Sequence, residues 1–303
     1  TGDEIITHPT LYGCTISLLN NWYTRYNIKT VTADLTNLDN LKNAITDNTK
    51  VIYFETPANP NLDIIDLTAL TNYIKEVNST RDDKDKIYVV VDNTFSTAFC
   101  QRPLEYGVDF VVYSLTKGMG GFGTDMGGAV IGKKSFRNIL LLYRKDFGGV
   151  LNTKSAWAIL TYGLPTLSLR MKKQIDTASK VAEFLNNHPK VKFVNYPGLK
   201  NYKYYEIAKR QMLDFDGNFA PGSMIYFGLA GNTPNECKEH GKVFMDYAAD
   251  FAYTMTLAVS LGHTRTLIEH PASMTHSVVP PELLLEKGID PGGVRIAIGL
   301  ENP

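Results

Sequence analysis

The chain has 303 residues, of which 44% are apolar and 20% charged, a composition typical of a globular protein with a sizeable core. Basic and acidic residues number 31 each, so the bulk charge gives no reason to expect nucleic acid or an anionic membrane as a partner. The longest apolar runs, such as VVV at 89–91 and NILLLY at 138–143, are too short to span a bilayer, and no signal peptide is visible. We therefore expect a small-molecule partner.

Three cysteines are spread widely along the chain: Cys14, Cys100 and Cys237. Their odd number and the lack of a CxxC motif argue against a disulfide framework and against a structural zinc site. A reducing compartment fits this usage, so we expect a cytoplasmic protein. The chain starts without an initiator Met and stops just after a strand-like segment, and we expect it to be a piece of a longer polypeptide that lacks parts at both ends.

The first half of the chain alternates short apolar runs with amphipathic segments. After TGDEIITHPTLYG, which reads as a turn and a strand, the runs VIYFETP, KIYVVVDNTF, VDFVVYSLTK and GGAVIG lie between residues 51 and 132. They are rich in Val, Ile and aromatic residues without polar alternation, as in strands covered on both faces. Leu67, Leu70 and Ile74 repeat at helical spacing between the first two runs. This βαβ pattern predicts an α/β fold with a mainly parallel sheet over residues 1–164.

The second half has a different pattern of apolar and polar residues. A long helical pattern that includes Ile175 is followed by VKFVNYPG, GSMIYFGLAG and GGVRIAIGLE. Between the last two, Thr233 as N-cap and Pro234 at the first helical position predict the start of another helix. Two or three strands with helices on one side predict a smaller α+β domain over residues 165–303.

Polar side chains follow the predicted parallel strands where each strand ends. They are Glu55, Asn59, Asp92, Ser114, Thr116 and Lys117. Ligands of open α/β sheets bind at this edge, and an unpaired charge at the mouth of a buried strand is costly without a partner. Asp92 suits a protonated ring nitrogen and Lys117 suits an aldehyde. The hydroxyls of Ser114 and Thr116 suit a phosphate. Pyridoxal phosphate has all three groups.

The chemistry of that cofactor requires these residue types. A desolvated lysine has a lowered pKa, so its amine can condense with an aldehyde. A carboxylate that faces the pyridine nitrogen keeps the nitrogen protonated and the ring electron-withdrawing. Taken singly, Asp92 could equally cap a turn, and Lys117 could be an ordinary solvated lysine. The joint set favours the cofactor.

The motifs VVVDNTF, YSLTKGMGGFG and HPASMTHS resemble the γ-family of pyridoxal-phosphate enzymes of cysteine and methionine metabolism. LYGCT, YFETPANP and GGVRIAIGLE belong to the same pattern, so the resemblance runs in order along nearly the whole chain. It implies the aspartate-aminotransferase-like fold (PLP fold type I), in which a smaller C-terminal α+β domain closes over a mainly parallel sheet. It also implies a homodimer or tetramer whose subunits share the active site.

The resemblance implies a role for each matching residue. Lys117 would bond to the cofactor aldehyde and then move protons on the substrate. Asp92 would pair with the pyridine nitrogen, and Tyr12 would stack on the ring. The other implied contacts are Ser114 and Thr116 to the phosphate, Asn59 near the ring hydroxyl, and Arg295 and Ser260 at the substrate α-carboxylate.

One branch of the family matches best. Cys14 follows YG, where the methionine γ-lyases carry Cys and the cystathionine lyases and homocysteine synthases usually carry Gly. SLG before LIEHPASMTHS resembles the same branch, and so does KDFGG, which makes Lys145 and Asp146 further substrate-site candidates. The branch implies α,γ-elimination of L-methionine to methanethiol, ammonia and 2-oxobutanoate, with Tyr12 as proton donor to sulfur. Taken alone, Cys14 could be a small core residue.

Some features depart from the family pattern. Phe122 stands where the family usually has His, and GTDMGG is closer to the sulfhydrylase version. The upstream glycine-rich phosphate-binding segment, and the Tyr and Arg that a neighbouring subunit lends, do not occur in these 303 residues. O-acetylhomoserine sulfhydrylase, cystathionine γ-lyase and an inactive binding protein of the same fold therefore stay open as alternatives.

Two further interpretations concern the C-terminal half. Arg295 alternates with Val294 and Ile296 on a predicted strand, so it could be solvated rather than bound to a substrate. The three histidines His263, His270 and His276 match no metal motif, and we expect them to be structural, with His270 capping before a proline.

Overall fold

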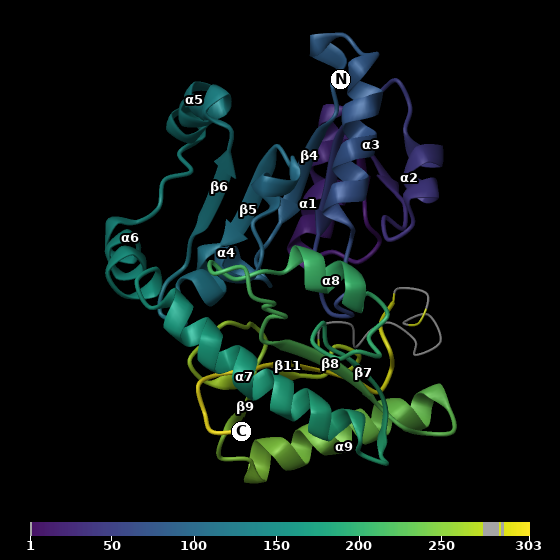
Figure 1. Ribbon diagram of the computed structural model, residues 1–303, viewed down its shortest axis with the longest axis vertical. Coiled ribbons are helices and arrows are strands. Elements are labelled where there is room, and N and C mark those ends of the chain that lie inside the picture. Colours follow the sequence, from purple (N-terminus) through teal and green to yellow (C-terminus); the bar gives the residue numbers. More distant parts are fainter. Residues whose placement is uncertain (1, 275–284, 286–287) are drawn as a thin grey trace.

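The computed structural model describes residues 2–274, 285 and 288–303. Within these residues the chain forms two β-sheets with helices packed around them (Figure 1). The first sheet has the strand order β2-β1-β3-β4-β5-β6 and the second β7-β8-β11-β10-β9. The strands of the first sheet are β1 (Glu4–Thr7), β2 (Lys29–Thr32), β3 (Thr49–Glu55), β4 (Tyr88–Asp92), β5 (Phe110–Ser114) and β6 (Gly128–Gly132). Those of the second are β7 (Val191–Asn195), β8 (Met224–Leu229), β9 (Met255–Leu257), β10 (Thr266–Glu269) and β11 (Gly293–Ala297).

The first sheet is parallel except where β6 runs antiparallel to β5. One face of its central strands is fully buried, as Ile52, Phe54 and Val91 show, whereas Tyr53 and Val90 on the opposite face are half-buried. The helices of this half are α1 (Gly13–Asn21), α2 (Leu38–Ala44), α3 (Leu67–Ser79), α4 (Thr97–Cys100), α5 (Arg137–Phe147) and α6 (Thr153–Ala158). The mainly parallel sheet predicted from the apolar runs is therefore confirmed.

Local sequence explains where the long helices begin. Asp66 caps α3 by accepting a hydrogen bond from the backbone N–H of Ala69 at 3.2 Å, and the apolar stripe of α3 is buried. The predicted helix start at Pro234 is confirmed, because the Thr233 hydroxyl accepts from the N–H of Glu236 at 3.1 Å. The helices of the second half are α7 (Leu167–Asn186), α8 (Tyr205–Gln211) and α9 (Pro234–Phe251).

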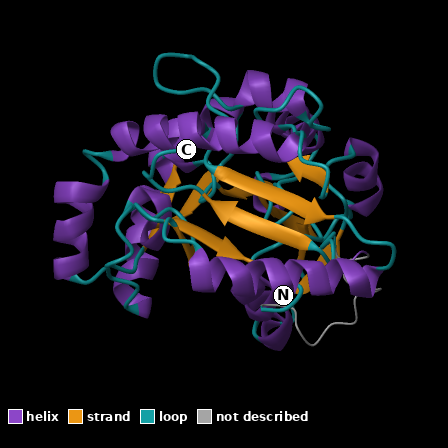
Figure 2. Cartoon of the chain, turned by 90° about the horizontal axis from the view of Figure 1, so that it is seen from below, coloured by secondary structure: helices purple, strands orange, loops and turns teal. Residues whose placement is uncertain are grey.

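The second sheet has more strands than the sequence predicted. Five strands form it within the described residues, whereas two or three were expected. The prediction was wrong because β9 has 3 residues and β10 has 4, too few for a visible apolar pattern. Helix α7 packs on β7 and β8, and α9 packs on β8, β9 and β11. Figure 2, seen from below, shows strands lying between long helices.

One continuous core joins the two halves. The largest group of buried apolar side chains runs from Ile52 in the first sheet through Met171 in α7 to Ile225 and Val294 in the second sheet. Just after the carboxyl end of β3, the Asn59 side chain accepts a hydrogen bond from Arg295 of β11 at 2.7 Å, so this edge of the first sheet faces the second sheet. None of the described helices combines the length and the apolar character needed to cross a membrane.

Candidate active site

The ends of neighbouring parallel strands bring the predicted site residues to one edge of the first sheet. Glu55, Asp92 and Ser114 are the last residues of β3, β4 and β5. Glu55 and Asp92 are register partners, so their side chains lie side by side on the same face. Tyr12 stands five residues after β1 at the N-cap of α1. The prediction that Glu55, Asp92 and Ser114 lie where parallel strands end is confirmed.

Lys117 lies in a short π-helical turn, Leu115–Met119, directly after β5. The backbone leaves helical geometry at Lys117 itself, with φ −97° and ψ −141°. Its Nζ donates to the Ser260 hydroxyl at 2.6 Å. Burial lowers the pKa of the Lys117 amine, and the charge of Arg295 lowers it further, while Glu269 opposes the shift. An amine in this setting gives up its proton more readily and is a better nucleophile than an exposed lysine.

A buried arginine of α7 holds the turn that carries Lys117. Arg170 donates from Nη1 to the carbonyl of Gly118 at 2.8 Å and from Nη2 to the carbonyl of Gly163 at 2.7 Å. Its guanidinium also lies 5.6 Å from the centroid of the Phe122 ring. Phe122, which stands where the family pattern usually has His, therefore packs against the arginine that holds this turn. Arg170 was not predicted from the sequence. The sequence feature that could have indicated it is a charged residue on the apolar stripe of a long helix.

Asp92 is a half-buried carboxylate without a cationic partner in the described part of the chain. Its Oδ1 accepts from the backbone N–H of Thr94 at 2.9 Å, and the Tyr53 hydroxyl also bonds to it. Burial raises the pKa of Asp92, while the bonds from Thr94 and Tyr53 lower it. Burial also raises the pKa of Glu55, to about 8, and the neighbouring Asp92 adds to the shift. A cation at this edge would find two carboxyls beside each other.

Tyr12 and Cys14 form a pair at the start of α1. Both side chains are exposed, with Tyr12 at 51%. A hydrogen bond to Cys14 is the main cause of a raised pKa at the Tyr12 phenol, followed by burial. The phenol therefore keeps its proton through neutral pH and can donate it.

Arg295 is buried on β11, with only 4% of its surface exposed, so the solvated interpretation is wrong. Neither the charge of Arg295 nor its alternation with apolar residues could predict this burial, because all five residues of β11 are buried, whichever face they project from. The guanidinium donates to the Asn59 side chain at 2.7 Å, to the Ser260 carbonyl at 2.8 Å and to Glu269 at 2.8 Å. Its Nε is buried and has no hydrogen-bond partner among the described residues. Glu269 was not predicted from the sequence.

Ser260 connects the two basic side chains of the site. Its hydroxyl accepts from Lys117, and its carbonyl accepts from Arg295. The residue has φ +94°, a left-handed value that is costly for any residue except glycine. Strain of this kind persists where the surrounding structure fixes a residue. Here the fixed residue, Ser260, sets the spacing between Lys117 and Arg295.

The two hydroxyl residues lie on either side of the end of β5. Ser114 is the last strand residue, and its backbone N–H donates to the Thr94 hydroxyl at 2.9 Å. Thr116 lies in the turn, where its hydroxyl accepts from the N–H of Gly127 at 3.1 Å. Both are partly exposed.

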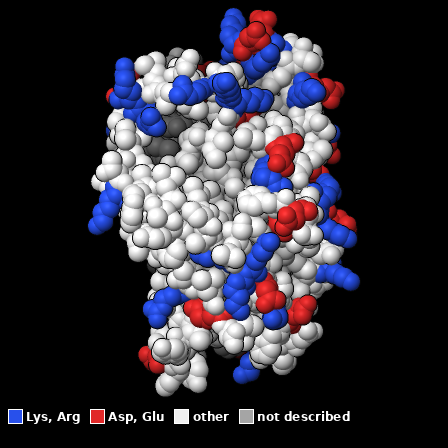
Figure 3. All heavy atoms as spheres, turned by 60° about the vertical axis from the view of Figure 1, so that its left-hand side comes forward, with Lys and Arg blue, Asp and Glu red and all other residues white. Residues whose placement is uncertain are grey.

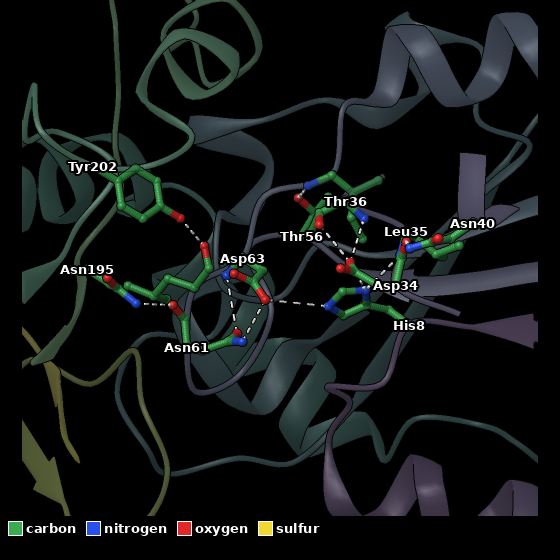
Figure 4. A network of polar contacts seen from close by, with 12 residues as sticks. His8, Asp34, Leu35, Thr36, Asn40, Thr56, Asn61, Asp63, Asn195 and Tyr202 are labelled. Atoms are coloured by element: carbon green, nitrogen blue, oxygen red, sulfur yellow. Dashed lines mark hydrogen bonds and ion pairs between the residues drawn. The ribbon is translucent and has the colours of Figure 1, made fainter. Parts of the chain in front are cut away.

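The loop that carries Asn59 is tied to both halves of the molecule (Figure 4). The Asn61 carbonyl accepts from Asn195 at 2.8 Å, and the Leu62 carbonyl accepts from Tyr202. On the other side, buried His8 lies 3.7 Å from the carboxylate of Asp63. These contacts keep the Asn59 side chain against Arg295.

Two predicted substrate residues lie apart from this group. Lys145 and Asp146 are exposed on α5, with 3.4 Å between Nζ and Oδ1, and Figure 1 places α5 at the far end of β6. Their role stays a prediction. His263 packs beside Gly123, and His270 bonds through its ring to Ser273 and the Pro291 carbonyl. His276 lies outside the described residues.

The residues present fit pyridoxal phosphate. Three groups stand at one strand edge: an amine with a lowered pKa, a half-buried carboxylate that pairs with no cation of the described residues, and an exposed aromatic ring. They match the aldehyde, the protonated ring nitrogen and the ring face. The orphaned Nε of Arg295 offers a donor to a carboxylate.

Comparison with known proteins places the chain in a family. A family model described as Cys/Met metabolism PLP-dependent enzyme matches residues 1–303. The chain is 44% identical over 303 residues to an L-methionine gamma-lyase of Fusobacterium nucleatum subsp. polymorphum, covering 99% of this chain and 71% of that protein. It is 38% identical over 301 residues to a cystathionine beta-lyase of Lactococcus lactis subsp. cremoris (strain MG1363), covering 99% of this chain and 73% of that protein.

A solved structure agrees with the fold. The crystal structure of cystathionine gamma-lyase from Lactobacillus plantarum complexed with L-serine matches with a TM-score of 0.85 at 32% identity, covering 100% of this chain and 73% of that one. The fold and site define a pyridoxal-phosphate enzyme of the aspartate-aminotransferase-like type. The chain belongs to the Cys/Met metabolism PLP-dependent enzyme family, and pyridoxal 5′-phosphate is its cofactor. The predicted family, fold and cofactor are confirmed.

Proposed function

We propose that the protein is a carbon–sulfur lyase that eliminates methanethiol and ammonia from L-methionine and leaves 2-oxobutanoate. One observation carries the proposal: Ser260 joins the Lys117 amine to the Arg295 guanidinium, so a proton-transfer group and a carboxylate-binding group stand at a fixed spacing. The relatives named L-methionine gamma-lyase, at 44% and 40% identity, support the substrate.

Each residue at the strand edge has a proposed part in holding the cofactor. Lys117 would bond to the aldehyde, Asp92 would pair with the ring nitrogen, and Tyr12 would cover the ring face. Asn59 would lie near the ring hydroxyl, and the hydroxyls of Ser114 and Thr116 would bind the phosphate. When bound, pyridoxal phosphate supplies an aldehyde for the substrate amine and a protonated ring that withdraws electrons from the amino acid.

The side chains then divide the work on the substrate. Arg295 holds the α-carboxylate through its free Nε, which orients the Cα–H bond. The neutral Lys117 amine takes the proton from Cα. Tyr12 keeps its phenolic proton and gives it to the sulfur that leaves Cγ, with Cys14 hydrogen-bonded beside it. Lys145 and Asp146 are proposed to approach the substrate only in the assembled protein.

A second copy of the chain is the proposed partner. The face that carries α5 and α6 shows a broad area without charged side chains in Figure 3. Its exposed apolar side chains are Val130, Ile131, Ile139, Leu142, Tyr143, Phe147, Trp157, Leu160 and Tyr162. A cavity of about 320 Å³, lined by Thr116, Phe122 and Tyr162 among others, lies beside them. Because Thr116 lines this cavity, a copy docked here would contribute to the cofactor site, as in a dimer or tetramer with shared sites.

We also propose two domains and a location. Residues 1–164 would form the cofactor domain and residues 165–303 the smaller domain, since the first sheet ends at β6 and the second begins at β7. Cys14, Cys100 and Cys237 form no disulfide with one another, which supports a cytoplasmic location.

Product analysis tests the proposed function. The protein, supplied with pyridoxal phosphate, is incubated separately with L-methionine, with cystathionine and with O-acetylhomoserine plus sulfide. Methanethiol and 2-oxobutanoate released in equal amounts from methionine are the expected result. Turnover of O-acetylhomoserine with sulfide alone would identify a sulfhydrylase, in line with GTDMGG, and turnover of cystathionine alone would identify a cystathionine lyase. No turnover of any substrate would identify a binding protein.

A further inference from the structure

Glu55 is a buried acid for which the proposed reaction has no use. Only 6% of its surface is exposed, at the end of the central strand β3. In the described part of the chain no lysine, arginine or histidine forms an ion pair with it. A buried acid without a cation is costly when charged, so its retention at the cofactor edge needs an explanation.

The contacts of Glu55 point toward two residues of the proposed cofactor site. Its Oε1 accepts a hydrogen bond from the backbone N–H of Tyr12 at 2.6 Å. The backbone N–H of Asn59 also donates to the same carboxyl. Tyr12 lies 43 residues before Glu55 in the chain, and Asn59 begins the loop that reaches Arg295. One carboxyl therefore joins the start of α1, the end of β3 and the loop after it.

The titratable groups around Glu55 are acids. Asp92 is its register partner on β4, the Tyr12 phenol lies on the α1 side, and Tyr53 lies two residues earlier on β3. Asp92 receives hydrogen bonds from Thr94 and Tyr53 that favour its charged form. Glu55 also accepts two backbone N–H bonds that favour its charged form, but burial and the neighbouring Asp92 outweigh them and raise its pKa to about 8. Two adjacent carboxyls whose surroundings differ in this way share one negative charge at neutral pH.

We propose that Glu55 is a positioning residue that works as a neutral carboxylic acid: it holds the backbone of Tyr12 and Asn59 at the cofactor site and leaves the single negative charge on Asp92. The inference rests on the proposed cofactor contacts of Tyr12 and Asn59. With Glu55 neutral, the strand edge presents one negative charge to one protonated ring nitrogen. A charged Glu55 would place two negative charges beside that nitrogen.

The test uses the cofactor-loaded protein and needs no substrate. Infrared difference spectra between wild type and Glu55→Gln at pH 7 should contain the carbonyl band of a protonated carboxylic acid, and the band should weaken as the pH is raised. The matched control is Glu76→Gln, an exposed acid on α3, whose difference spectrum should lack the band. A carboxylate signal from Glu55 at pH 7 would overturn the proposal.

Cofactor affinity gives the second measurement, by titration of the cofactor-free variants at pH 7. Glu55→Gln keeps a neutral acceptor, so its affinity should stay within about twofold of wild type, whereas Glu55→Ala should lose about tenfold to a hundredfold because two backbone donors lose their partner. A Glu55→Gln variant as weak as Glu55→Ala would show that the charge matters and would refute the neutral acid. Because methionine is absent from both measurements, failure of the proposed lyase activity would leave this result intact.

Discussion

The Lys117 amine owes its proposed reactivity to neighbours that come from distant parts of the chain. Ser260 lies 143 residues away in sequence, yet its hydroxyl accepts from Nζ at 2.6 Å. Burial and Arg295 lower the pKa of the amine, and Glu269 limits that shift while pairing with Arg295. The guanidinium is thereby balanced by one carboxylate and still retains an unpartnered Nε. The site holds two basic side chains because each has a specific partner: Ser260 for Lys117 and Glu269 for Arg295.

The raised pKa of Glu55 predicts a pH-dependent stability. The pKa rises from 4.5 to about 8 on folding, so between these values the folded protein holds a proton that the unfolded chain has lost. Stability must then fall as the pH rises through this window, by up to about 1.4 kcal/mol per pH unit, and level off above it. Glu55→Gln removes this loss.

Urea unfolding of the cofactor-free wild type and of Glu55→Gln, from pH 4 to pH 9, measures the effect. The difference in the free energy of unfolding should grow in favour of Glu55→Gln as the pH rises. A constant difference across the range would contradict the raised pKa. Glu76→Gln serves as the control and should follow the wild type.

The residues of the site were predictable to different degrees. Asp92 and Ser114 follow from the apolar runs, because a parallel sheet places the carboxyl ends of its strands at one edge. The pairing of Arg295 with Glu269 could not be predicted from spacing, since it depends on how antiparallel β10 and β11 align. Arg170 was missed because its partners are backbone carbonyls in a turn that the sequence describes only as glycine-rich.

At the scale of elements, short strands limited what could be predicted. The strands β3, β4 and β5 carry 5 to 7 residues of strong apolar character, whereas β9 and β10 carry 3 and 4. Short strands are defined by their neighbours more than by their own sequence. The second sheet was therefore expected to be smaller than it is.

Gly262 allows the C-terminal half of the chain to lie directly against the turn that carries Lys117. The residue has φ +75°, and a Cβ there would lie 2.2 Å from the backbone nitrogen of Gly118. Gly262→Ala should therefore displace the turn and lower the free energy of unfolding by about 1 to 3 kcal/mol. Cofactor affinity should fall as well.

Gly149→Ala is the matched control, because nothing lies within 4 Å of a Cβ at Gly149. Denaturant midpoints and cofactor titrations of both variants give the comparison. Equal behaviour of the two variants would show that the turn tolerates movement and that Gly262 does not fix it.

At the scale of the whole molecule, the α5–α6 face predicts self-association. Leu142 on α5 is 48% exposed within that face. An Asp at this position would place a charge in the proposed contact between copies, so Leu142→Asp should lower the molar mass in solution, as measured by light scattering. Phe184→Asp changes an exposed apolar residue of α7 outside that face and should leave the mass unchanged. A wild type that is monomeric, or a Leu142→Asp variant with the wild-type mass, would contradict a contact at this face.

The central claim is that Lys117 carries the cofactor at the edge where β3, β4 and β5 end. Borohydride reduction of the cofactor-loaded protein fixes the cofactor to the lysine nitrogen that holds it, and peptide mass analysis then locates the added mass. We predict the cofactor on Lys117, in the peptide that contains YSLTKGMGG, and no labelling after Lys117→Arg. Labelling of any other lysine in the wild type would contradict the account.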